Sequence, residues 1–500
     1  MASPRFPSRS PLGSCALPLA AAALLLTGCG GQEPRPAPKP AAYATRPSLL
    51  LVTLDTTRAD AVAPEADAGA TPNLAALGAR ALRFTQAYST APTTLPAHAS
   101  MMSGLYPAGH GVHENGRRVG DRVDLVAERL GALGYATGAF VSGFPLERQF
   151  GLARGFAVYD DEFGAGKVER DARATTERAL AWLAARPAGP FFLWVHYYDP
   201  HDPYEPPEPF RSRFAGDPYR GEIAAMDHEL GRLLAAFEEK AGGPWRALVL
   251  ADHGEGRGDH GESLHGNLLY QGVMRVPLLA AGSDLAPGER TDPVSIRQVR
   301  ATLLGWAGEP ASGDLLAPTG EPALGEAMQP FLNYRWQPQT MAVLGRQKLI
   351  RSGRNELYDV LGDPGETRDL TPTEAPDRAL ARAVADYPLP APPRPGTPEP
   401  ALGDEEKRRL ASLGYLTSEA APAIVPPSAP RAADMTRLFA DLDLGSRAFV
   451  DGEYARVVPI FERILREDPG NLMAAVRLAV ARAFLGQDEG ALRAFAVARR

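Results

Sequence analysis

Several residue types that support common chemistries are rare in this sequence. Only two cysteines occur among the 500 residues, Cys15 and Cys29, and both precede the first expected strand at 49–54. The folded part that follows therefore has no disulfide, no thiolate metal ligand and no cysteine nucleophile. Lys and Arg form no block, and the net charge of −7 argues against nucleic acid as a partner.

A hydrophobic run long enough to span a bilayer comfortably is also missing. The apolar run at 16–26 has the length and shape of a signal-peptide core. It leads into Leu26-Thr27-Gly28-Cys29, which resembles the bacterial lipobox, where cleavage leaves a lipid-modified cysteine. We therefore expect membrane attachment through a lipid on Cys29, in the bacterial cell envelope, at the outer membrane or facing the periplasm. An ordinary signal peptide with a chance cysteine is the alternative.

The remaining composition, 44% hydrophobic and 23% charged, allows a large buried core. From residue 47 to about 370, strand-like apolar runs alternate with helix-like segments, which predicts an α/β fold with a large, mostly parallel sheet sandwiched by helices. A hairpin-bearing stretch near 341–360 predicts a small α+β subdomain. The clearest expected strands are 49–54, 136–142, 191–197, 248–251 and 277–280, and the expected helices are 71–83, 125–133, 168–185 and 221–240.

The last segment has a helical pattern that repeats. Gly452 and Phe461 recur as Gly486 and Phe495, each 34 residues further along. This spacing resembles the tetratricopeptide repeat and predicts an all-α tail that could bind a protein partner, with two unrelated amphipathic helices as the alternative. The expected regions are a signal peptide at 1–28, a Pro/Ala-rich tether at 29–46, a catalytic domain at 47–372, a Pro-rich linker region at 373–432 and the repeats at 433–500.

Candidate metal ligands follow two of the expected buried strands. Asp55 directly follows the run 49–54, and Asp252 and His253 directly follow the run 246–251. The carboxyl ends of parallel strands meet at one edge of a sheet, so these side chains form an oxygen, oxygen and nitrogen ligand set for a divalent cation. Thr94 is the hydroxyl that such a cation would touch and activate as a nucleophile. The helix expected from 95 would aim backbone N–H groups at an anionic ester.

Several segments of the sequence resemble motifs of the sulfatase family of the alkaline phosphatase superfamily. They are the segments at 54–60, 94–104, 199–204, 251–255, 270–277, 356–359 and 363–366. The resemblance covers most of 47–372 and implies a metal-dependent hydrolase acting on phosphoric or sulfuric esters, whether small or carried by a glycan or lipid.

The departures from that family pattern shift the expected chemistry. Sulfatases carry a Cys or Ser that becomes formylglycine, and Thr94 stands at that position, with His98 where the family has arginine. The family's calcium-type site also has a second acidic residue and an asparagine, where this chain has Thr56 and His253. Imidazole suits zinc or manganese better than calcium. The resemblance therefore favours the threonine-using phosphoesterases of the superfamily.

The sequence gives several other polar residues more than one possible role. His201 and His265 are expected to serve the oxyanion or the leaving group, although with Asp199 they could instead hold a second metal. His98 either touches the anion or is a neutral spacer, and Asp199 is assigned to substrate binding. Glu222, on a helix, is expected to form a structural salt bridge.

Two other functions stay open on the sequence. One is a catalytically degenerate scaffold that recruits envelope proteins through its helical repeats. The other is true sulfuric ester hydrolysis by the unmodified threonine. The retained ligand set argues against the scaffold.

Overall fold

The computed structural model describes residues 46–66, 68–164, 166–186, 188–317, 320–390, 403–412 and 425–499. All of these belong to one unit, 42–500. The expected signal peptide, Cys29 and the tether up to residue 45 lie outside the described residues. Within the described ranges, no helix is both long and apolar enough to cross a membrane.

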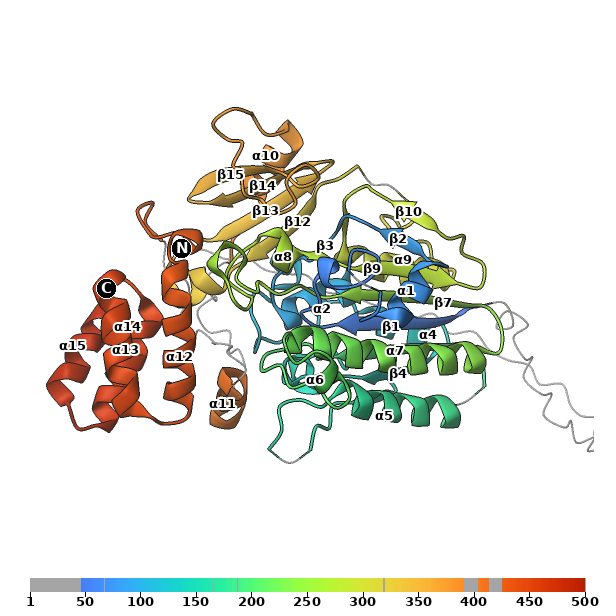
Figure 1. Cartoon of the computed structure of the whole chain (residues 1–500), viewed down its shortest axis with the longest axis horizontal. Helices are drawn as coiled ribbons and strands as arrows, with labels where there is room; N and C mark the ends of the chain where they lie inside the picture. The colour runs from blue at the N-terminus through green and yellow to red at the C-terminus, as the bar shows by residue number, and fades with distance from the viewer. Residues whose placement is uncertain are drawn as a thin grey trace, which may run out of the picture. The chain divides into compact units, whose positions relative to one another are not determined.

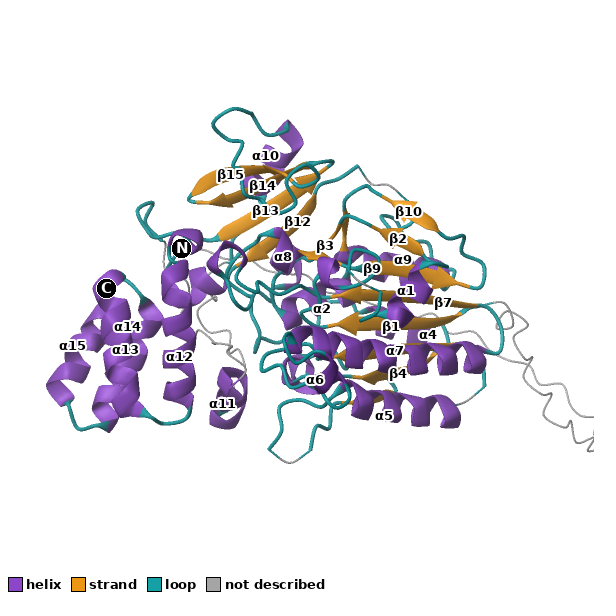
Figure 2. Cartoon of the chain, in the orientation of Figure 1, coloured by secondary structure: helices purple, strands orange, loops and turns teal. Residues whose placement is uncertain are grey.

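A large sheet of eight strands organises the chain (Figure 2). Its strand order is β10-β2-β9-β7-β1-β6-β4-β5, and all neighbours are parallel except for β9, which is antiparallel to both β2 and β7. The strands of this sheet are β1 (Ser48–Leu54), β2 (Leu82–Phe84), β4 (Ala136–Phe140), β5 (Val158–Asp160), β6 (Phe191–Tyr197), β7 (Trp245–Ala251), β9 (Leu278–Gly282) and β10 (Gly288–Arg290). A small second sheet contains β11 (Val294–Ser295), β3 (Ala87–Tyr88) and β8 (Arg275–Val276).

Helices cover both faces of the large sheet, as the sequence predicted. On one side α5 (Ala172–Ala185) packs beside α7 (Pro218–Ala241) (Figure 1), and α1 (Pro72–Gly78) also packs on α7. On the other side α9 (Val299–Trp306) contacts α2 (Thr94–Ser103) and α4 (Val126–Ala132). The short helices are α3 (Pro107–His110), α6 (Phe210–Arg213) and α8 (Gln271–Met274). The central strands β1 and β6 are completely buried, which explains their continuous apolar runs.

The register of the three central strands places their carboxyl ends side by side. Leu54 of β1 pairs with Tyr197 of β6 and with Ala251 of β7. The next residue after β1 is Asp55, and the next after β7 is Asp252. Two acidic side chains therefore leave the same edge of the sheet from neighbouring strands, as the sequence predicted.

The C-terminal third adds a subdomain and a helical tail, which confirms the predicted fold class. The subdomain is an antiparallel sheet of β12 (Ala323–Ala327), β13 (Gln339–Leu344), β14 (Gln347–Ser352) and β15 (Arg354–Asp359), with α10 (Arg378–Asp386) packed on it. A short α11 spans Asp404–Ser412, and the tail contains α12 (Phe439–Val450), α13 (Tyr454–Glu467), α14 (Leu472–Phe484) and α15 (Asp488–Ala498).

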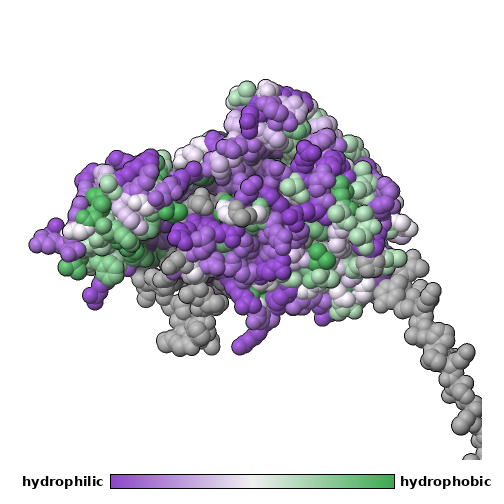
Figure 3. Space-filling model, turned by 90° about the horizontal axis from the view of Figure 1, so that it is seen from below, coloured by the Kyte–Doolittle hydropathy of each residue, from purple (hydrophilic) through white to green (hydrophobic). Residues whose placement is uncertain are grey.

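The tail shares a hydrophobic core with the subdomain. Trp336 is completely buried in this core and stacks against Phe439 of α12. Its indole Nε1 donates a hydrogen bond of 2.7 Å to Asp468, which follows α13. The far helices are less covered, since Phe484, Leu492 and Phe495 are at least half exposed, and hydrophobic residues gather over this part of the surface in Figure 3.

Removing the Asp468 carboxylate should loosen the tail. Asp468→Ala leaves the buried indole N–H of Trp336 without an acceptor, which costs about 1–3 kcal/mol, and we expect the melting temperature to fall by several degrees. Glu489→Ala, at an exposed acidic residue of α15, is the matched control and should leave it unchanged. Equal melting temperatures for Asp468→Ala and wild type would show that this contact does not hold the tail.

Candidate metal centre

Three buried polar atoms converge at the carboxyl edge of the central strands. Ligand atoms of Asp55, Asp252 and His253 all lie within 4.8 Å of one another, and all three residues are completely buried. His253 Nε2 is 3.6 Å from Asp55 Oδ1 and 3.5 Å from Asp252 Oδ2. Among the described residues, none of these three atoms has a hydrogen-bond partner. Buried polar atoms are rarely left unpaired, so the group fits a divalent cation.

Each ligand is oriented by a bond from its other polar atom. His196 Nε2 donates to Asp55 Oδ2 at 3.1 Å, and the backbone N–H of His253 donates to Asp252 Oδ1 at 2.8 Å. The His253 Nδ1–H donates to the carbonyl of Gly254 at 2.9 Å, which leaves the Nε2 lone pair facing the carboxylates. Such outer hydrogen bonds fix the tautomer and direction of a metal ligand. His196 thus orients one of the candidate ligands.

The backbone beside two of the candidate ligands is unusual at Thr56 and at Gly254. Thr56, directly after Asp55, has φ of +49°, an unusual conformation for a β-branched residue, and its carbonyl accepts a hydrogen bond from Tyr219. Gly254 follows His253, and a Cβ there would lie 2.1 Å from the carbonyl oxygen of Gly272. Only glycine fits this close approach.

The electrostatics of the group also favour a cation. Burial, and then the charge of Asp55, raise the pKa of Asp252 well above its usual value. For Asp55, burial works in the raising direction, but the hydrogen bond from His196 and the nearby histidines hold its pKa below the usual value. Burial lowers the pKa of His253 to about 3, so its imidazole is neutral at physiological pH, the form that binds metals. A divalent cation would relieve the repulsion between the two carboxylates.

Thr94 is the first residue of α2 and is completely buried. Its carbonyl accepts a hydrogen bond of 2.8 Å from His98 Nδ1, and the same nitrogen lies 3.5 Å from Asp252 Oδ2. His98 Nδ1 therefore lies between the Thr94 carbonyl and the Asp252 carboxylate. This places Thr94 close to the candidate metal ligands.

His98 has both ring nitrogens engaged with protein atoms. Its Nε2 accepts from Thr53 Oγ1 at 2.9 Å, and Trp194 Nε1 donates to the same hydroxyl at 3.0 Å. Burial lowers the pKa of His98 to about 3. Of the two expectations for His98, contact with the anion and a neutral spacer, this arrangement favours the spacer.

The sequence predicted that backbone N–H groups at the start of α2 would point at an anionic ester, and this prediction is wrong. Leu95 N–H donates to Asn115 Oδ1 at 2.8 Å, Pro96 has no N–H, and Ala97 N–H donates to a backbone carbonyl. The sequence analysis missed Asn115, whose buried Nδ2 has no partner among the described residues. No local pattern marks this residue, because it approaches α2 from a separate loop.

His201 and His265 lie next to the ligands as a second layer. The ring centroid of His265 is 4.5 Å from that of His253 and 5.2 Å from that of His201. Glu255, another residue that the sequence analysis missed, accepts a hydrogen bond of 3.0 Å from His265 Nδ1. Burial disfavours protonation of both rings and lowers the pKa of His201, but the Glu255 carboxylate outweighs burial at His265 and raises its pKa. His265 is thus the better proton donor of the two.

The structure does not bring Asp199, His201 and His265 together as a second metal site. Within the described ranges, the only group of three His, Cys or acidic residues with converging ligand atoms is the one around Asp55. Asp199 instead lines a cavity together with His201 and with Glu222 of α7. The expected salt bridge of Glu222 is wrong, since Glu222 Oε1 accepts the backbone N–H of Glu205 and Oε2 has no partner among the described residues.

This arrangement gives Glu222 a measurable effect on stability. Burial and the nearby Asp199 raise the pKa of Glu222 to about 9 from its ordinary 4.5. The unfolded chain therefore loses this proton first, and stability contributed by the protonated form is lost as the pH rises toward 9. We expect Glu222→Gln to melt at a higher temperature than wild type, by a margin that widens from pH 6 to pH 9. A margin independent of pH would contradict this.

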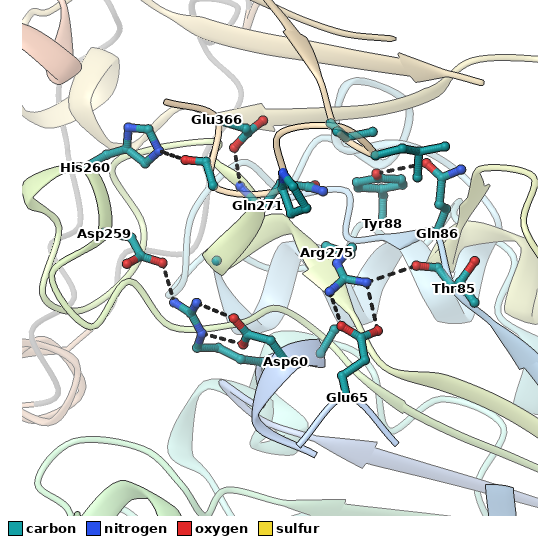
Figure 4. A pocket seen from close by; sticks show the side chains of 17 residues that line it. Asp60, Glu65, Thr85, Gln86, Tyr88, Asp259, His260, Gln271, Arg275 and Glu366 are labelled. Atoms are coloured by element: carbon teal, nitrogen blue, oxygen red, sulfur yellow. Dashed lines mark hydrogen bonds and ion pairs between the residues drawn. The ribbon is translucent and has the colours of Figure 1, made fainter. Parts of the chain in front are cut away.

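A larger cavity, of about 570 Å³, lies away from the converging ligand atoms and is lined by neither Asp55 nor His253 (Figure 4). Its charged side chains are mostly paired with each other. Arg58 bonds to Asp60 and Asp259, and Arg275 pairs with Glu65. Among the described residues, its acidic and histidine side chains do not form a converging ligand group.

The C-terminal tail reaches the surroundings of His201. Arg447 of α12 forms an ion pair of 2.6 Å with Asp202, the residue after His201. Asp443, one turn earlier on α12, is partly buried, and this burial raises its pKa to about 6. The tail therefore contributes residues near the metal centre.

Comparisons with known proteins agree with this geometry. The sulfatase family model matches residues 47–309. A delta 4,5-hexuronate-2-O-sulfatase of Bacteroides thetaiotaomicron is 23% identical over 402 residues, covering 64% of this chain and 83% of that protein. The multifunctional alkaline phosphatase superfamily protein PehA of Trinickia caryophylli is 24% identical over 490 residues, covering 69% and 94%. The solved phosphonate monoester hydrolase of Agrobacterium radiobacter shares the fold, with a TM-score of 0.56, 20% identity, and coverage of 68% and 94%.

Proposed function

Because this chain belongs to the sulfatase family of ester hydrolases, we propose that it is a metal-dependent hydrolase or transferase that cleaves phosphate esters with Thr94 as nucleophile. The observation that carries the proposal is the convergence of Asp55 Oδ1, Asp252 Oδ2 and His253 Nε2, buried and unpartnered among the described residues, beside the start of α2. The Thr94 hydroxyl would be a further ligand of the cation.

A divalent cation bound by these three residues would lower the pKa of a hydroxyl and offset charge on an anionic ester. The Thr94 hydroxyl would release its proton to solvent, its oxygen attacks phosphorus, and the bond from phosphorus to the leaving oxygen breaks. His265 gives its proton to that leaving oxygen, and Glu255 holds the imidazole in place. Asn115 Nδ2 supplies an N–H donor for the anion. Water, or an acceptor alcohol in a transferase, then releases the phosphoryl group from Thr94.

A phosphoester is favoured over a sulfate ester because Thr94 has no thiol or primary hydroxyl to oxidise to formylglycine. True sulfate hydrolysis by unmodified threonine is the second candidate, supported by sulfatases among the relatives. Zinc or manganese is favoured over calcium because the set includes an imidazole. A degenerate scaffold is disfavoured by the completeness of the ligand set.

We also propose that the tail is built of tetratricopeptide repeats. Gly452 and Gly486, 34 residues apart, have nearly equal φ of +72° and +70° in matching turns between helices. The exposed Phe495 corresponds to the buried Phe461, as at the uncovered end of a stack. A protein partner at this end and lipid attachment at Cys29 in the cell envelope are proposals of the same kind.

The direct test compares two chromogenic esters on zinc- or manganese-loaded protein. We expect bis(p-nitrophenyl) phosphate to be turned over with a kcat/KM at least about tenfold above that for p-nitrophenyl sulfate. A preference for the sulfate would overturn the phosphoester assignment. No turnover of either ester by protein with full metal content would favour the scaffold.

A further inference from the structure

A cavity lined by acidic side chains borders the metal centre. It has a volume of about 440 Å³ and reaches His201, which lies next to the metal-ligand group. Its carboxylates come from four separate parts of the chain, namely the approach to α5, the end of β6, the loop that follows and α7. They are Glu169, Asp171, Asp199, Glu205 and Glu222.

Two of these carboxylates each have an oxygen without a hydrogen-bond partner among the described residues. Glu222 is only 6% exposed, and its Oε2 is buried without a hydrogen-bond partner among the described residues. Asp199 Oδ2 is buried and unpartnered in the same way. Buried carboxylate oxygens normally have donors, so these two imply a missing one that enters the cavity.

The basic residues of the cavity do not neutralise it. Arg170 directs its guanidinium to Asp160, which does not line the cavity. Lys167 is exposed at the rim and is the only other Lys or Arg in the lining. Burial and mutual repulsion raise the pKa of Asp199 and of Glu169 to about 7, in keeping with an excess of negative charge.

We propose that this acidic cavity binds a primary ammonium group of the substrate, so that the enzyme acts on an anionic ester that also carries an amine. The inference rests on the proposed function, because it places the ester at the metal centre and the amine beyond His201. The anionic group would be held by a cation bound to Asp55, Asp252 and His253, and by Asn115. The raised pKa of Glu222 leaves it protonated in the empty cavity, so an entering ammonium group would displace that proton and be held by the carboxylates of Glu222 and Asp199.

The geometry favours an ammonium group over a metal ion or a quaternary amine. In the part of the chain that the structure describes, the cavity's carboxylates do not form a converging ligand group of the kind found around Asp55. A quaternary amine has no N–H and would leave Glu222 Oε2 and Asp199 Oδ2 unpartnered. Such groups are usually bound by aromatic cages, and Tyr198 is the only aromatic phenol, indole or phenyl ring in the lining.

Binding measurements test this without requiring turnover. Isothermal titration calorimetry on zinc-loaded protein would compare ω-aminoalkyl phosphonates of two to six carbons with alkyl phosphonates in which a methyl replaces the ammonium. We expect the best aminoalkyl phosphonate to bind at least about tenfold more tightly than its methyl counterpart. In Glu222→Gln the advantage should fall below about threefold, with the affinity for the alkyl phosphonate unchanged. Gln keeps an oxygen to accept from Glu205.

Glu229→Gln is the matched control, because Glu229 is equally buried on α7 but pairs with Arg232 outside the cavity. It should keep the full advantage. Equal binding of amino and methyl compounds by wild type, or an advantage that survives in Glu222→Gln, would overturn the proposal. So would a trimethylammonium compound that binds more tightly than the primary amine.

A further experiment distinguishes failure of this inference from failure of the proposed function. n-Butylammonium alone should raise the melting temperature of wild type and not that of Glu222→Gln. If no phosphonate binds but butylammonium acts in this way, the metal-centre assignment fails and the cavity assignment stands. If phosphonates bind without regard to the amine and butylammonium has no effect, only the cavity assignment fails.

Discussion

Thr94→Ala should lower kcat/KM toward bis(p-nitrophenyl) phosphate by at least about 10³-fold. Alanine removes the attacking oxygen, and no cysteine exists in the folded part to replace it. The contact to His98 should be kept, because it uses the Thr94 carbonyl and not its side chain. Steady-state kinetics on metal-loaded protein measures the loss.

Two substitutions control this result. Thr93→Ala removes the neighbouring hydroxyl, which does not cap α2, and should keep kcat/KM within a few-fold of wild type. Thr94→Ser retains an oxygen and should keep more activity than Thr94→Ala. If Thr94→Ala stays within about tenfold of wild type, Thr94 is not the nucleophile, and a directly attacking water must take its place.

The placement of Asp55 and Asp252 could be predicted because it depends on local signals. Continuous apolar runs identify buried parallel strands, and their carboxyl ends share one edge of the sheet. The same reasoning located β6 at Phe191–Tyr197 without error. Boundaries were less accurate where tertiary pairing decides them. The helix expected over 71–83 ends at Gly78, since Leu82–Phe84 pairs with β9 and β10 as a strand.

The parts of the site that depend on distant contacts could not be predicted. Glu222 looked like a helix-surface residue suited to a salt bridge, but the fold directs it into a cavity shared with Asp199. Asn115 lies in a loop without a recognisable pattern, and the motif at 251–255 gave Glu255 no role, so only the structure shows what these residues contact. The role of His98, in α2, was ambiguous because it depends on a contact with Thr53 of strand β1.

Asp252→Asn should abolish the stabilisation that a divalent metal gives to the wild type. A ligand that binds only the folded state stabilises by about 4 kcal/mol at a thousandfold excess over its Kd. We expect wild type to show a large rise in melting temperature with zinc or manganese, and the variant to show little. Activity toward the phosphodiester should fall with the metal content, measured by elemental analysis of the purified protein.

The order of stabilities should reverse when metal is removed. In EDTA, wild type retains Asp55 and Asp252 side by side, and burial together with the charge of Asp55 raises the pKa of Asp252. Asparagine bears no charge there, so the variant should then melt at or above the wild-type temperature. Asp259→Asn, in the loop after His253 but outside the ligand group, should follow wild type in both conditions. Parallel behaviour of Asp252→Asn and wild type with and without metal would mean that these carboxylates bind no cation, and that their burial has another cause.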